Sequence, residues 1–274
     1  MPDQRQSAIV TGTASGLGRA LALRLAASGW QIALCDVDAE GNAETARLVD
    51  AAGGLARIEQ LDVALPGDWQ ALSDRLRGEW PQLDLLVNNA GIGPLGNVGV
   101  FPLDQWHKTI DVNLYGTILG CHTLLDWLRA NPRGAHIINV ASFAAIAPSP
   151  AMAAYNVSKA GVVALSETLY GELRTSRVGV TVVCPMHFPS RILAASPHFD
   201  QQRFEMMRES TERSTLTAEF VADVALRAMR RKELYAIPGR RARWYWWLRR
   251  LTPVRFLNGL APALERDASG GLSG

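Results

Sequence analysis

The chain has 274 residues, of which 48% are hydrophobic and 20% charged, as is typical of a soluble globular protein. A net charge of +2 argues against a dedicated nucleic-acid binder, and the three widely spaced cysteines predict neither a metal site nor a disulfide framework. No signal peptide and no apolar run of the ~18 residues needed for a spanning helix is evident, so we expect a cytoplasmic protein.

Short apolar runs alternate with longer amphipathic ones along the chain. In chain order, the pattern predicts strands at 8–10, 31–35, 55–61, 83–87, 136–140, 180–184 and 234–237, and helices at 17–28, 40–52, 69–80, 103–131, 154–174 and 217–230. Fully apolar strands that alternate with helices predict an α/β fold with a parallel sheet covered on both faces. We therefore expect a single doubly wound Rossmann-like domain over residues 1–238, followed by a basic and aromatic extension at 239–274.

A glycine-rich turn follows the first predicted strand. It contains Gly12, Gly16 and Gly18, with Ser15 and Leu17 between the last two. Glycines let a backbone approach a pyrophosphate closely, and the helix that begins there offers free N–H groups to phosphates. A tight strand-to-helix turn would explain the same residues, but the position after a first strand favours dinucleotide binding.

An acidic residue, Asp36, ends the second predicted strand. A carboxylate at this place accepts hydrogen bonds from the ribose hydroxyls of the adenosine half and repels a 2′-phosphate. No basic residue stands at Ser15 or Val37 to pair with such a phosphate. The cofactor is therefore expected to be NAD, although a solvated loop acid is the alternative for Asp36.

Polar and small residues also follow the third and fourth predicted strands. Asp62 and Val63 stand where they can hold an adenine, and Asn89, Ala90 and Gly91 stand where the chain must pass beneath a cofactor. Ordinary turn chemistry explains each pair equally well, because Asp, Asn and Gly dominate turns.

The chemistry is carried by Ser142, Tyr155 and Lys159. Ser142 follows the fifth strand, while Tyr155 and Lys159 are four apart on a predicted helix and share a face. An ammonium near a phenol is expected to lower the phenol's pKa, so that Tyr155 exchanges a proton with an alcohol or carbonyl. Ser142 can then hydrogen-bond the substrate oxygen. No metal is expected.

Together these motifs resemble the classical short-chain dehydrogenases/reductases over residues 7–190. The resemblance implies a seven-stranded sheet, nicotinamide chemistry and a homodimer or homotetramer. It also implies that Asn113 holds a water that links Lys159 to a proton relay. The catalytic residues carried over are Asn113, Ser142, Tyr155 and Lys159, and the cofactor residues are Gly12, Ser15, Gly16, Leu17, Gly18, Asp36, Val37, Asp62, Val63, Asn89, Ala90, Gly91, Tyr155, Lys159, Pro185, Phe188 and Ser190.

The match departs from the family pattern after the sixth strand. The family has Pro-Gly there and then a Thr that contacts the nicotinamide amide, whereas this chain has Pro185-Met186 and, a few residues on, Ser190. A hydroxyl is retained, but the backbone around Met186 is expected to differ. His187 is interpreted as a pocket-lining or partly exposed residue rather than a second acid/base.

The expected activity is NAD-dependent hydride transfer to or from a hydrophobic secondary alcohol or ketone. The segments 92–101, 143–152 and 188–199 are expected to line the substrate site, because they are apolar and hold few charges. Arg191 leaves room for an anionic small-molecule substrate. The alternatives are an inactive NAD-binding regulatory relative and an epimerase or dehydratase on the same scaffold.

The segment after residue 238 differs from the rest of the chain in charge. Residues 238–266 hold seven arginines and one acidic residue, and four aromatics stand together at Trp244–Trp247. We expect this segment to pack on a second subunit or over the substrate pocket. The alternative is weak contact with a membrane surface, with Trp and Tyr at the headgroup level and Arg facing anionic lipid. The helical periodicity argues against it, because Trp244, Trp247, Leu248 and Leu251 share a face whereas Tyr245 and Trp246 do not. Residues 266–274 are expected to be disordered.

Overall fold

A computed structural model describes residues 5–259 of the chain. Within them, seven strands form one sheet in the order β3-β2-β1-β4-β5-β6-β7, and every neighbouring pair is parallel. The strands are β1 Ser7–Thr11, β2 Gln31–Asp36, β3 Leu55–Gln60, β4 Leu85–Asn88, β5 Ala135–Val140, β6 Val178–Val183 and β7 Tyr235–Ala236. The predicted α/β Rossmann-like fold is confirmed.

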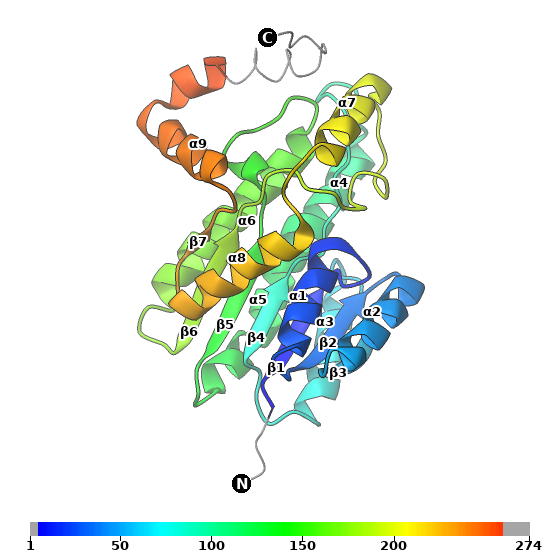
Figure 1. Ribbon diagram of the computed structural model, residues 1–274, viewed down its shortest axis with the longest axis vertical. Coiled ribbons are helices and arrows are strands. Elements are labelled where there is room, and N and C mark those ends of the chain that lie inside the picture. The colour runs from blue at the N-terminus through cyan, green and yellow to red at the C-terminus, as the bar shows by residue number, and fades with distance from the viewer. Residues whose placement is uncertain (1–4, 260–274) are drawn as a thin grey trace.

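Helices cover both faces of the sheet (Figure 1). One face packs against α1 Gly16–Ala26, α2 Ala39–Ala51 and α8 Ala218–Arg231, and the other against α3 Pro66–Arg77, α5 Gly116–Ala130 and α6 Ala153–Glu172. The alternation along β1 shows why: Ala8 and Val10 enter the first core, whereas Ile9 enters the second. Apolar side chains on both faces of each strand therefore fix a sheet with two helical layers.

Two helical predictions need correction. The single helix expected at 103–131 is α4 Leu103–Ile110, a π-helical turn Asp111–Tyr115 and α5, because the extra residue of a π-turn leaves no trace in apolar periodicity. The helices α7 Gln201–Glu212 and α9 Arg240–Leu251 were not predicted. Only Thr211 of α7 is buried, so α7 lacks the apolar stripe that marks a helix in sequence.

The carboxyl ends of the strands lie along one edge of the sheet, and this edge positions the site. Figure 1 shows α7 and α9 beyond that edge, with α9 close to β7 and α6. No helix within residues 5–259 is long and apolar enough to cross a membrane. The expected disorder of 266–274 falls outside the described residues, and the domain boundary at 238 stays a prediction.

Candidate active site

The glycine-rich turn between β1 and α1 is closed by direct backbone contact. Gly12 and Gly16 have φ angles of 72° and 54°, in the left-handed region that favours glycine. A Cβ on Gly18 would overlap the carbonyl of Gly12, and one on Gly12 would lie 2.8 Å from Asn89 Nδ2. Glycine is therefore required at Gly12 and Gly18 by packing within the protein.

The start of α1 fits the phosphates of a dinucleotide. The helix begins at Gly16, and the side chain of the preceding Ser15 makes no capping hydrogen bond. The first N–H groups of α1 therefore lack the side-chain acceptor that commonly satisfies them. A Cβ on Gly16 would meet only Ser190 within 4 Å, at 3.7 Å, so glycine keeps the space over the helix end open. Leu17 is buried and anchors the helix beneath.

The carboxylate of Asp36 lies against this turn. One oxygen accepts a hydrogen bond from Ala14 N at 2.8 Å, and the other accepts from Asp38 N at 3.0 Å. The neighbouring Val37 is 61% exposed at the rim. Asp36 therefore fixes the glycine-rich turn as well as bringing negative charge to the end of β2.

Asp62 and Val63 make the contacts of an ordinary turn. Asp62 Oδ1 accepts from Ala64 N at 3.0 Å, and Val63 O accepts from Trp69 Nε1 at 3.0 Å. These contacts agree with the alternative interpretation of the two residues, in which they only form a turn. A role for the pair in holding adenine stays a prediction.

The segment after β4 is fastened to the end of β1 by Thr11. Its hydroxyl accepts from Asn89 N at 2.9 Å and Ala90 N at 3.0 Å, while Asn89 Nδ2 donates to Thr11 O at 2.8 Å. A Cβ on Gly91 would lie 3.0 Å from Asn113 Oδ1 and 3.3 Å from Lys159 Nζ. The absence of a side chain at Gly91 thus lets polar groups from α6 and the π-helical turn approach each other.

Lys159 is almost completely buried, with 3% exposure. Its ammonium donates to Val140 O at 2.9 Å and lies 5.8 Å from the centroid of the Tyr155 ring. Burial lowers the pKa of Lys159 to about 8, because a charged amine loses its hydration there. The side chain is thus poised to gain or lose its proton near neutral pH.

The pKa of Tyr155 corrects a sequence-based expectation. We expected the ammonium to lower it, but in this structure burial raises the phenol's pKa, while a hydrogen bond with Ser142 lowers it by a smaller amount. Desolvation of the phenolate outweighs the neighbouring polar groups. The protonated phenol is therefore the favoured form, ready to donate a proton to a carbonyl.

Ser142 is held in place at the end of β5. Its hydroxyl oxygen accepts from Ala144 N at 3.1 Å, which begins a short 3₁₀ turn at Phe143–Ala145. The next residue is tied to β6's end, since Phe143 N donates to Pro185 O at 2.8 Å. The structure thus brings Ser142, Tyr155 and Lys159 together, and their catalytic roles stay a prediction.

Asn113 is fully buried in the π-helical turn, where its side chain makes three hydrogen bonds. Its amide accepts from Ile92 N at 2.8 Å and donates to Ile92 O at 2.9 Å and to Ser158 Oγ at 3.1 Å. It therefore joins the segment after β4 to α6. The role of Asn113 in holding a relay water stays a prediction.

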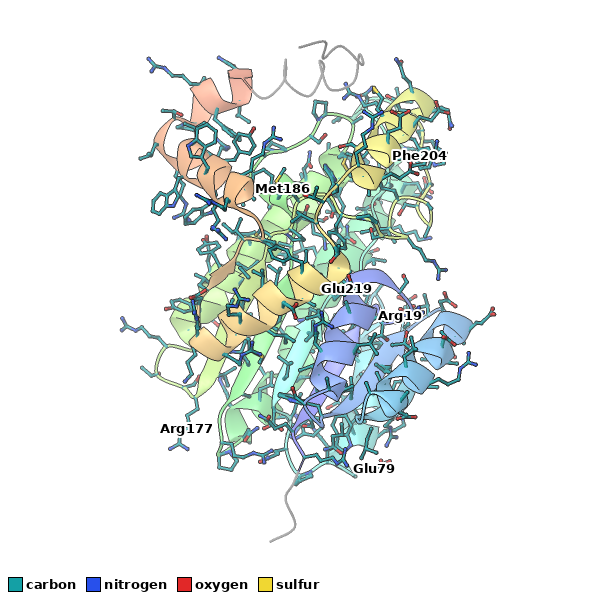
Figure 2. All side chains as sticks on the ribbon, viewed as in Figure 1. Arg19, Glu79, Arg177, Met186, Phe204 and Glu219 are labelled. Atoms are coloured by element: carbon teal, nitrogen blue, oxygen red, sulfur yellow. The ribbon has the colours of Figure 1, made fainter. Side chains whose placement is uncertain are left out.

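The segment after β6 crosses the mouth of the glycine-rich turn. Ser190 lies against Gly16, and Phe188 packs on the core beneath α1 and α8. Met186 has no positive φ, so the position does not need glycine, and its side chain packs in the cluster with Phe143 and α9 (Figure 2). The exposed His187 contributes its carbonyl, which accepts from Ser214 Oγ at 2.7 Å.

The three segments expected to line the substrate site contact one another. Single bridges pair Leu95 with His198 and Gly96 with Met152, and Gly93 N donates to the buried Ser196 Oγ at 2.8 Å. Several of the predicted lining residues serve as the core of these loops, because Leu95, Phe143 and Met152 are almost fully buried. Ile92, Ile146, Phe188, Ile192 and Leu193 keep partial exposure.

Sequence reasoning missed one contact that links the two sides of the site. Arg191 Nη2 lies 3.2 Å from Asp38 Oδ2, which joins the segment after β6 to the start of α2. It also gave no positioning role to Thr11 and Ser158, which hold Asn89 and Asn113. The adjacency of Thr11 to Gly12 was the available signal for the first, whereas nothing local in the sequence connects positions 38 and 191.

Known proteins share this arrangement. A family model described as short chain dehydrogenase matches residues 6–200. The chain is 34% identical over 232 residues to the probable oxidoreductase EphD of Mycobacterium tuberculosis, which covers 82% of this chain but only 39% of EphD. It is 36% identical over 181 residues to 3beta-hydroxysteroid dehydrogenase 1 of Eggerthella lenta, covering 66% of this chain and 69% of that protein. A solved short chain dehydrogenase/reductase from Burkholderia phymatum, in complex with NAD, matches with a TM-score of 0.86 at 29% identity, over 93% of this chain and 96% of that one.

Proposed function

The chain belongs to the short-chain dehydrogenase family, and from this premise we propose that it is an NAD-dependent oxidoreductase acting on a hydrophobic secondary alcohol or ketone. The observation that carries the proposal is the meeting of Ser142, Tyr155 and the buried Lys159 beside Gly91. The nicotinamide, when bound, supplies or accepts the hydride. Tyr155 exchanges the proton at the substrate oxygen, and Ser142 orients that oxygen by hydrogen bonding.

The residues present fit a dinucleotide, and several features support NAD over NADP. Asp36 brings a negative charge to the end of β2, where a 2′-phosphate would be repelled. The two nearby cations are engaged elsewhere: Arg19 donates to Ala14 O and Thr45 Oγ1, and Arg191 pairs with Asp38. The rest of the dinucleotide would be held by Gly12, Ser15 and Gly16, with Val37 at the rim of the site.

The substrate class rests on the apolar side chains that stay partly exposed between the three loops. Because Arg191 pairs with Asp38, a neutral substrate is favoured over an anionic one. The relative from Eggerthella lenta, which is 36% identical to this chain, is named as a hydroxysteroid dehydrogenase. We also propose a homodimer or homotetramer, from the family resemblance alone, and a cytoplasmic location.

The test is a screen for NAD⁺ reduction with aliphatic, cyclic, aromatic and steroid alcohols, read as NADH formation. Hydrophobic secondary alcohols should be oxidised faster with NAD⁺ than with NADP⁺, and polyols slowly or not at all. Tight NAD binding without turnover of any alcohol or ketone would instead support the inactive regulatory relative. Isomerisation or loss of water without net NADH formation would support the epimerase or dehydratase.

A further inference from the structure

The helix α9 is anchored to the body by one of its faces. Ala242 is fully buried, and the Tyr245 ring lies 6.3 Å from that of Phe143. The Trp246 ring lies 5.3 Å from that of Tyr235, on the edge strand β7. These contacts include the two aromatics that made the periodicity of the segment look poor, and they fix the orientation of the helix.

The opposite face of α9 carries large apolar side chains that the described residues leave uncovered. Trp244, Trp247 and Leu251 are 60%, 56% and 75% exposed, and Val254, just beyond the helix, is 67% exposed. Positions 244, 247 and 251 have the spacing of a single helical stripe. We call these four residues the exposed stripe. A helix that is apolar on two opposite faces needs a second partner for the exposed one.

Arginines border the exposed stripe on both sides. At 3.6 residues per turn, Arg243 and Arg250 lie along one side and Arg241 along the other. Two of them are held by the anchored aromatics: Arg250 lies 4.0 Å from the centroid of the Trp246 ring, and Arg241 lies 5.3 Å from that of Tyr245. No acidic residue occurs between positions 238 and 259. The border is therefore a positive rim with no acidic residue on its own helix.

We propose that the exposed stripe docks on the surface of an anionic phospholipid bilayer. Tryptophans favour the headgroup level, Leu251 and Val254 can reach the acyl boundary, and the arginines meet lipid phosphates. The helix lies on the membrane and does not cross it, in keeping with the absence of a spanning helix among residues 5–259.

Charge argues against a second copy of the chain as the occupant. A two-fold contact through the exposed stripe would bring the same patch of both copies together, so each arginine rim would face the other. Like charges placed against each other across an interface are strongly unfavourable, and residues 238–259 hold no acid to relieve them. An anionic surface satisfies both the apolar stripe and the rim.

The same helix also contacts the loop that follows Ser142. Arg249 Nε donates to Ile146 O at 3.3 Å, and Tyr245 packs on Phe143. Docking through the opposite face would therefore place α9 between the lipid surface and this loop.

The test is co-sedimentation of the full chain with vesicles of phosphatidylcholine alone or of phosphatidylcholine with phosphatidylglycerol, at ~0.15 M salt. The protein should bind the mixed vesicles and not the neutral ones. The triple variant Trp244→Ser, Trp247→Ser, Leu251→Ser should lose at least tenfold in partitioning. Arg241→Gln with Arg243→Gln, which removes one rim arginine from each side, should lose about fivefold per arginine. Leu103→Ser is the matched control, since Leu103 is as exposed as Leu251 at 75%, and it should bind like wild type.

Thermal unfolding of each variant checks that the substitutions at exposed positions leave the fold intact. Absence of binding to the mixed vesicles, or equal binding to both kinds, would overturn the proposal. So would a stripe variant that halves the molecular mass in light scattering without any change in lipid binding, since that result would assign the stripe to a second copy. Because sedimentation does not depend on turnover, its failure is distinguishable from failure of the proposed function.

Discussion

The two halves of the sheet's carboxyl edge are built by different means. At the ends of β1 to β3, the contacts are mostly main-chain: Gly12 packs on Ala90, and Asp36 accepts from backbone N–H groups. At the ends of β4 to β6, buried side chains such as Asn113 and Lys159 define the geometry. The geometry of the first half therefore depends on many peptide groups, whereas that of the second depends on a few side-chain atoms. Substitutions should therefore act gradually in the first half and abruptly in the second.

The largest expected effect is that of Tyr155→Phe in the second half. The ring is kept but the proton carrier is lost, so kcat should fall by at least the ~10² typical of a removed acid/base. NAD binding, measured by titration calorimetry, should change little. Tyr170→Phe, on the same helix but exposed, is the matched control and should be neutral. Near-normal turnover of Tyr155→Phe with a good substrate would contradict the assignment.

The next largest effect is expected in the pH dependence of turnover, which should be set by the second half of the edge and not by the first. Burial raises the pKa of Tyr155, so the phenolate needed for alcohol oxidation is scarce at neutral pH and grows as pH rises. Oxidation should therefore increase by up to about tenfold per pH unit above neutrality, whereas carbonyl reduction, which uses the phenol, should stay level. The measurement is kcat/KM in both directions. Asp36→Asn should leave the shape unchanged, and a flat oxidation profile would show that Tyr155 is not the titrating base.

A smaller change is expected at Asp36. Asp36→Asn removes the charge but keeps an oxygen that can accept from Ala14 N, so the preference for NAD over NADP in kcat/KM should narrow about tenfold. Asp36→Ala should narrow it too. It should also raise KM for both cofactors, because Ala14 N and Asp38 N lose their acceptor. A wild-type enzyme that prefers NADP would contradict this account.

Local patterns predicted most of the fold and suggested the candidate site, because apolar strands, the glycine-rich turn and the Tyr155–Lys159 spacing are all short-range features. Apolar periodicity did not predict α9, because this helix has apolar residues on two faces. Only the tertiary contacts of Tyr245 and Trp246 show which face is packed on the protein. Periodicity also could not detect the π-helical turn around Asn113. The raised pKa of Tyr155 depends on burial within the assembled site, which residue spacing does not encode.

Contacts between distant positions were the least predictable, and the pair formed by Arg191 and Asp38 is one example. It spans both halves of the edge, joining the segment after β6 to the residue that caps α2 by accepting from Gly41 N. The Arg191 and Asp38 side chains are 63% and 37% exposed, so the pair is worth little on its own. We expect it to hold the Phe188–Ser190 segment over the glycine-rich turn.

The smallest predicted effect tests this pair. Arg191→Ala should raise KM for NAD by about two- to fivefold and leave kcat unchanged, because the pair holds the segment after β6 and makes no contact with Tyr155 that would affect proton exchange. Asp38→Asn should do the same, since asparagine keeps the helix cap but loses the charge. The double variant should show the same KM for NAD as either single variant, because each single substitution already removes the whole interaction.

High salt screens exposed ion pairs, so it should raise the wild-type KM for NAD to that of the variants. Arg213→Ala, which removes another exposed paired arginine, should have no effect. Additive changes, or a fall in kcat at constant KM, would show that the two residues act separately.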